Sequence, residues 1–278
     1  TGTVEIPASH ALTGLLPSTT YHYRLVAENA IATFWGGDRT FTTEAIPPTV
    51  ETGGADGITA AGATLHGAAN AHNAETGVWF EYWPEGGGAQ SASAAPATVT
   101  GPGDTSVSLT LAYLLPKTDY YYRVVAESAG GLTQGTEASF TTLASAPTAR
   151  TDDADEVTSG GATLHGTVNA RNAVADVWFE YGLTDAYGSE ARATPATASG
   201  TADTAVRLTL AGLAPSTTYH YRVVAENATG TTYGEDATLT TEAPPPDPTP
   251  GTTPDATPGT TPDLTAQPTP DLTAQPTP

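Results

Sequence analysis

The 278-residue chain has no cysteine and no methionine, and lysine occurs once, as Lys117. Without cysteine there is no disulfide, and no thiolate is present to bind a metal or act as a nucleophile. Each folded part must therefore be stable through its own hydrophobic core. Because methionine is absent, residue 1 is not a translation start, and we expect a processed product or a fragment of a longer protein.

Positive charge is also scarce. The chain has 9 basic and 30 acidic residues, for a formal net charge of −21. Nucleic acids and anionic membrane surfaces are bound by clustered lysine and arginine, so this composition argues against both as partners. No apolar run reaches the roughly 18 residues of a membrane-spanning helix, so no membrane insertion is expected. A large charge of one sign favours solubility and opposes non-specific association.

The chain does contain an internal repeat of 99 residues. The repeated segments are LLPSTTYHYRLVAEN (15–29), LLPKTDYYYRVVAES (114–128) and LAPSTTYHYRVVAEN (213–227), ATLHG (63–67 and 162–166) and VWFEY (78–82 and 177–181). Such self-similarity is typical of modular arrays. It predicts two full modules at 46–144 and 145–243. Residues 1–45 match only the second half of a module.

Within a module, apolar and polar residues alternate with a period of two. Tyr219, Tyr221 and Val223 alternate with His220 and Arg222. This alternation over short β-branched and aromatic runs is typical of half-buried strands, and no segment shows a capped helical period. About seven short strands per module fit an antiparallel β-sandwich. The predicted fold class is therefore all-β.

A motif at the end of each module carries a resemblance to a known family. LxPxTxY at 213–219 is followed by YRVVAxN at 221–227, and related copies begin at residues 15 and 114. The modules resemble bacterial fibronectin type III-like modules over residues 1–243. The resemblance implies tandem immunoglobulin-like β-sandwiches. It also implies a tyrosine corner, a hydroxyl bonded back to the backbone, at Tyr21, Tyr120 and Tyr219.

The chain departs from the animal form of that family at the second strand. Leu164 stands where animal modules usually bury a tryptophan, and no Arg-Gly-Asp triplet is present. The receptor-binding roles of animal modules are therefore not carried over, because one scaffold hosts many unrelated functions.

The composition changes at residue 244. Residues 244–278 are rich in threonine and proline, repeat every eight residues and lack tyrosine, tryptophan, phenylalanine and valine. Such a segment cannot form a core, and we expect an extended tail near polyproline II. It is interpreted either as a flexible spacer or as a glycan-coated rod or connector between subunits. Candidate O-glycosylation sites are Thr249, Thr252, Thr253, Thr257, Thr260, Thr261, Thr265, Thr269, Thr273 and Thr277.

One candidate interaction face lies on the outward side of the third and sixth strands. It would carry Trp79 and Arg123 in the first full module, and Trp178, His220 and Arg222 in the second. Tryptophan beside arginine could stack on sugar rings or on a neighbouring subunit. The alternative is that arginine packs over tryptophan as an intrachain cation–π pair.

Residues 1–45 form a second unusual feature. About three strands are expected there, and three strands cannot bury the interior of a sandwich alone. His10 aligns with Leu109 and Leu208, so the half-module also has a poorer core than its copies. Two explanations stay open: upstream sequence absent from this chain covers the face, or a neighbouring chain completes it by strand addition.

The sequence contains no recognised catalytic, cofactor-binding or metal-binding motif. Two pairs of histidines recur with the repeat, His66 with His165 and His22 with His220, so they lie in separate modules. We therefore predict no metal site, and no catalytic or cofactor-binding residue is assigned. The acidic run at 152–156 lacks the glycine and distal glutamate of an EF-hand loop, which favours a solvated turn over a calcium site. Asn227 begins the only N-glycosylation sequon, Asn-Ala-Thr.

Together these features predict a non-catalytic structural protein located outside the cell or on its surface. It would be a subunit of a fibre, stalk or surface filament, with glycans on the tail threonines. Its expected partner is a second copy or a neighbouring chain that completes residues 1–45, with glycans as further candidates. The alternative is a spacer or binding region of a secreted polysaccharide-active enzyme or adhesin.

Overall fold

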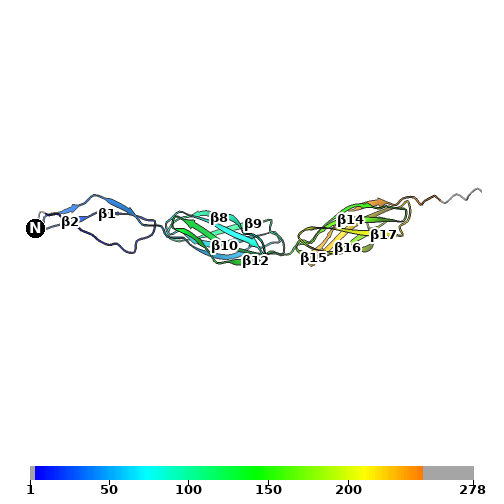
Figure 1. Cartoon of the computed structure of the whole chain (residues 1–278), viewed down its shortest axis with the longest axis horizontal. Coiled ribbons are helices and arrows are strands. Elements are labelled where there is room, and N and C mark those ends of the chain that lie inside the picture. The colour runs from blue at the N-terminus through cyan, green and yellow to red at the C-terminus, as the bar shows by residue number, and fades with distance from the viewer. Residues whose placement is uncertain (1–3, 247–278) are drawn as a thin grey trace, which may run out of the picture. The chain divides into compact units, whose positions relative to one another are not determined.

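The computed structural model describes residues 4–246, and every regular element in that range is a β-strand. Figure 1 shows that the strands of each full module gather into one body. Residues 247–278 of the predicted extended tail, which include its ten candidate threonines, lie outside the described residues. No helix within 4–246 is long and apolar enough to cross a membrane.

The first full module contains eight strands. They are β5 (Thr49–Asp56), β6 (Gly62–Asn70), β7 (Thr76–Pro84), β8 (Gln90–Val99), β9 (Asp104–Ala112), β10 (Asp119–Ser128), β11 (Gly131–Gln134) and β12 (Ala138–Thr141). One layer pairs β5, β6 and β9, and the other pairs β8, β7 and β10 with β11 and β12. β8 links the layers because Ala95 also pairs with Ser108 of β9.

The second full module repeats this arrangement. Its strands are β13 (Thr148–Asp155), β14 (Gly161–Asn169), β15 (Ala173–Gly182), β16 (Gly188–Gly200), β17 (Asp203–Ala211), β18 (Thr218–Asn227), β19 (Gly230–Tyr233) and β20 (Ala237–Thr240). The predicted all-β class, with β-sandwiches in tandem, is confirmed. The strand count is eight rather than about seven, because the last strand of each module is interrupted. β19 pairs with one end of β18 and β20 with the other.

Each module buries a core between its two layers. In the first, Leu65, Phe80, Tyr122 and Val124 are fully buried. Their counterparts in the second are Leu164, Phe179, Tyr221 and Val223. The inward positions of the last long strand are those that the alternation predicted, since successive side chains of a strand point to opposite faces.

Residues 4–45 differ from the two full modules. They form β1 (Thr20–Tyr23), β2 (Val26–Glu28), β3 (Thr33–Trp35) and β4 (Arg39–Thr42), with β1 paired to β4 and β2 to β3. Residues 4–19 contain no strand. Their counterpart β9 is held by nine pairs with β6, and residues 4–45 contain no equivalent of β6. Four strands are found where about three were expected, because the counterpart of β10 is divided into β1 and β2.

Candidate functional site

The tyrosine of each repeated motif closes a turn. The hydroxyl of Tyr21 accepts a hydrogen bond from the Leu16 amide at 2.8 Å. Tyr120 and Tyr219 accept from the amide five residues earlier, each at 3.0 Å. This is the contact implied by the resemblance, and it fixes the turn before β1, β10 and β18.

The outward face of β15 and β18 is partly covered rather than freely exposed. Trp178 pairs across the strands with Val224, which is fully buried although it points away from the main core. Trp79 pairs in the same way with the fully buried Val125. Both tryptophans are half-buried, and Trp178 Nε1 is buried with no hydrogen-bond partner. Each of these two rings therefore shields the valine that it pairs with on the neighbouring strand from solvent.

Arg222 lies at the centre of a polar cluster on this face. Its guanidinium bonds to Glu180 Oε2 at 2.7 Å. It also lies over two rings, 4.6 Å from the centroid of Tyr187 and 4.1 Å from that of Tyr233. The guanidinium of Arg222 is thus bonded to a carboxylate and packed on two aromatic rings, which is favourable for a planar cation.

The same arginine occurs in the other modules with different aromatic partners. Arg123 bonds to Glu81 Oε2 at 2.6 Å and lies 5.7 Å from the ring centroid of Trp83. Arg24 lies 4.0 Å from the ring centroid of Trp35. The alternative that arginine packs over Trp79 or Trp178 was therefore wrong about the ring, although cation–π pairing itself occurs. Cross-strand neighbours, which sequence spacing does not reveal, select the ring.

His220 joins the cluster through a carboxylate. His220 Nδ1 and Asp236 Oδ2 are 2.8 Å apart, and Tyr187 donates to Asp236 Oδ1 at 3.0 Å. Burial, together with the hydrogen bond to Asp236, raises the pKa of Tyr187 to about 12. The phenol therefore remains neutral, and remains a donor, through physiological pH.

A single carboxylate also lies beside three other histidines, His22, His66 and His165. His22 contacts Asp38 at 2.8 Å, and His165 contacts Asp155 at 2.8 Å. Within residues 4–246 no group of three or more histidine, aspartate or glutamate side chains is arranged to hold a metal ion.

The acidic run at the start of the second module is held by nearby side chains. Asp152 contacts Arg150 at 2.8 Å and accepts from Thr167 at 2.8 Å. Glu156 accepts from Thr163 at 2.8 Å. The carboxylates therefore point to separate partners rather than to one common centre.

Asn227 has a structural role in the β18–β19 turn. Its Nδ2 donates to the Ser145 carbonyl at 2.9 Å, and its Oδ1 accepts from the Thr229 amide at 2.8 Å. The candidate N-glycosylation atom is therefore engaged in a hydrogen bond within the fold.

Sequence reasoning missed a contact that recurs at both module junctions. Asn73 and Asn172 occupy left-handed conformations, with φ of 67° and 61°. Asn73 Nδ2 lies 3.3 Å from the Pro17 carbonyl oxygen and 3.2 Å from Thr19 Oγ1. Asparagine tolerates this backbone region better than most residues. The recurrence of asparagine at positions 73 and 172, 99 residues apart, was the signal in the sequence that could have indicated this contact.

The second junction repeats the first. Asn172 Nδ2 lies 3.3 Å from the Pro116 carbonyl oxygen, 3.1 Å from that of Lys117 and 3.0 Å from Thr118 Oγ1. In both cases the acceptors belong to the Pro-x-Thr turn that the tyrosine corner closes. The repeated LxPxTxY motif therefore shapes the turn and also presents the acceptors for the next module.

Comparison with known proteins finds matches among solved structures alone. No protein-family model matches the chain, and no curated protein does. Among solved structures, the chain is similar to the FN1–FN3 domains of chicken CNTN1, at 20% identity and a TM-score of 0.31, covering 82% of this chain and 77% of that one. It is also similar to the sensor domain of the anti-sigma factor RsgI4 of Pseudobacteroides cellulosolvens, at 21% identity and a TM-score of 0.30, covering 36% of this chain and 97% of that one.

Proposed function

We propose that the chain is a non-catalytic structural protein of the cell exterior, in which serial β-sandwich modules form part of a fibre, stalk or surface filament. The observation that carries this proposal is the recurring junction contact. Asn73 and Asn172 each bind the Pro-x-Thr turn of the module before them. A contact repeated between successive copies serves to join modules, and modular arrays are stabilised by such nearest-neighbour terms.

The outward-facing polar groups support a structural role over catalysis. Arg123 and Arg222 are bound to glutamates and packed on rings, so their guanidinium groups are already occupied. The histidine contacts described above each use one carboxylate. These contacts stabilise the sheets.

Electron microscopy and mass spectrometry of material from the native source would test this proposal. We expect filaments or stalks built from the chain, with hexose mass increments on the threonines of residues 249–277. A monodisperse, unmodified monomer would contradict it.

The second candidate is a binding region of an adhesin or of a secreted polysaccharide-active enzyme. It is favoured by two aromatic rings that remain open beside arginine, Trp35 and Tyr233, with exposed fractions of 59% and 51%. Such rings can stack on sugars. Binding to a glycan array that disappears in Trp35→Ala and Tyr233→Ala, but persists in Trp79→Phe, would support this candidate.

A further inference from the structure

The half-module formed by residues 4–45 exposes side chains that its copies bury. Tyr23 and Leu25 have exposed fractions of 53% and 64%. Their counterparts are Tyr122 and Val124 in the first full module and Tyr221 and Val223 in the second, and all four are at most 1% exposed. Since the surrounding sequence is nearly the same, the difference arises from what covers these positions.

The full modules show which elements provide that cover. Tyr122 donates its hydroxyl hydrogen to the Gly53 carbonyl of β5 at 2.8 Å. The Val124 amide donates to Thr52 Oγ1, also in β5, at 3.1 Å. The second module makes both contacts with its own β13, at 2.9 Å and 3.2 Å. The half-module therefore lacks a strand that presents a threonine hydroxyl and a carbonyl oxygen to these positions.

A backbone edge is open as well. In the first full module β10 pairs with β7 over nine residues, Tyr120 to Ser128. The corresponding β1 and β2 pair only with β4 and β3 among residues 4–45. An unpaired edge next to an apolar surface is the arrangement that β-strand addition uses, with backbone bonds giving affinity and side-chain pockets giving selectivity.

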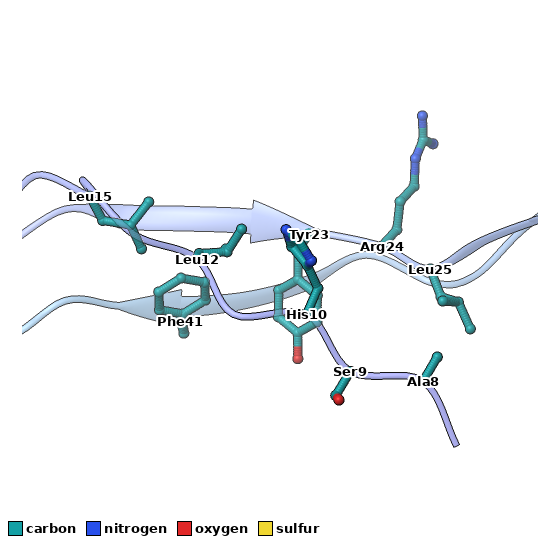
Figure 2. Close-up of a pocket in the computed structure, with 9 residues that line it drawn as sticks. All are labelled: Ala8, Ser9, His10, Leu12, Leu15, Tyr23, Arg24, Leu25 and Phe41. Carbon is teal, nitrogen blue, oxygen red and sulfur yellow. The ribbon is translucent and has the colours of Figure 1, made fainter. Parts of the chain in front are cut away.

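The exposed surface is also hollow. A cavity of about 850 Å³ is lined by residues that include His10, Leu12, Tyr23, Leu25 and Phe41. In Figure 2 Leu25 points to the opposite side of the chain from Arg24, as expected for neighbours in extended backbone. Arg24 packs on Trp35, so this outward side chain already has a partner, whereas the inward Leu25 is 64% exposed.

We infer that this surface, the half-module face, is a docking site for a polypeptide segment that carries the four-strand pattern of residues 46–99. The inference goes beyond the proposed function, because it holds whether or not the chain forms a fibre. The segment must place a glycine opposite Leu25. In the full modules a Cβ at Gly67 would overlap Val124 Cγ2, and one at Gly166 would lie 2.9 Å from Val223 Cβ. It must also offer the threonine of β5.

The test adds a synthetic polypeptide with the sequence of residues 46–99 to the full chain and follows amide hydrogen exchange. We expect the amides of residues 23–26 to gain at least about tenfold protection. Thr52→Val in the added segment should remove protection chiefly at the Leu25 amide, whereas Gly67→Val should abolish binding. Absence of protection with the unmodified segment overturns the inference.

Variants of the full chain supply matched controls. Leu25→Asp alters an exposed side chain and should weaken binding at least about tenfold, while Ile31→Asp, exposed in the β2–β3 turn, should leave it unchanged. Equal effects of the two substitutions overturn the inference. A dimer that protects residues 23–26 without added segment also overturns it, because a second copy would then cover the face.

A second arm joins residues 46–99 directly to Thr1, which keeps the 99-residue register because Thr1 and Gly2 correspond to Thr100 and Gly101. We expect residues 4–45 to become protected as strongly as residues 103–144. Continued rapid exchange at residues 23–26 in this fusion refutes the inference even if the separate segment is insoluble. Filament formation is not measured in either arm, so failure here is distinct from failure of the proposed function.

Discussion

The glycine of the repeated ATLHG segment sets how closely the two layers of a module approach. In the first full module a Cβ at Gly67 would overlap Val124 Cγ2 and lie 2.7 Å from the Glu51 carbonyl oxygen. Val124 is fully buried, and Glu51 belongs to β5, which pairs with β6 at this position. Neither atom can move away without opening the core or the β5–β6 pairing.

We therefore predict that Gly67→Ala destabilises its module by about 3 kcal/mol, the upper end of the cost of overpacking. Gly166→Ala should cost less, about 1–2 kcal/mol, because its closest contacts are side-chain atoms of Val223 at 2.9 and 3.0 Å. Gly77→Ala is the matched control. Nothing lies within 4 Å of its added Cβ, so it should be neutral or stabilise by up to about 1 kcal/mol.

Urea unfolding of the full chain, followed by tryptophan fluorescence, measures these differences. Trp79 and Trp83 report on the first full module and Trp178 on the second. With a slope of about 1–3 kcal/mol/M, Gly67→Ala should lower the midpoint of its module by at least about 1 M. If Gly67→Ala and Gly77→Ala unfold at the same urea concentration, the close approach at this glycine does not limit packing and the reasoning is refuted.

Three further predictions concern the junction, the buried hydroxyl and pH. Asn172→Ala should remove about 0.5–1.5 kcal/mol of coupling to Thr118, and a double-mutant cycle with Thr118→Val that shows no coupling would contradict this. Tyr221→Phe should cost about 1–2 kcal/mol, because the Asp152 carbonyl loses its donor, and an unchanged urea midpoint would argue against that contact. The pKa of Tyr187 is raised to about 12 in the folded chain, so its contribution to stability should be complete below pH 10 and lost as pH rises to about 12. Ultraviolet titration of the folded chain should show the ionisation of this phenol near pH 12, and the Tyr187→Phe variant should lack that ionisation.

Residues 4–45 show where sequence reasoning stopped. The repeat predicts that they belong to the second half of a module, with His10 at a leucine position. The sequence did not show that residues 4–19 would form no strand. Strand formation depends on a pairing partner far along the chain, so a pattern of alternation alone cannot guarantee it.

The alternation of inward and outward side chains, the module period and the tyrosine of each corner followed from the sequence, because a strand has a fixed two-residue period and a turn is a local structure. Only the tertiary structure decided which ring packs on each arginine, that Trp178 covers Val224, and that Asn172 binds the turn of the module before it. Those contacts join residues from different strands or modules. Their partners are set by register and loop conformation, which no local pattern encodes.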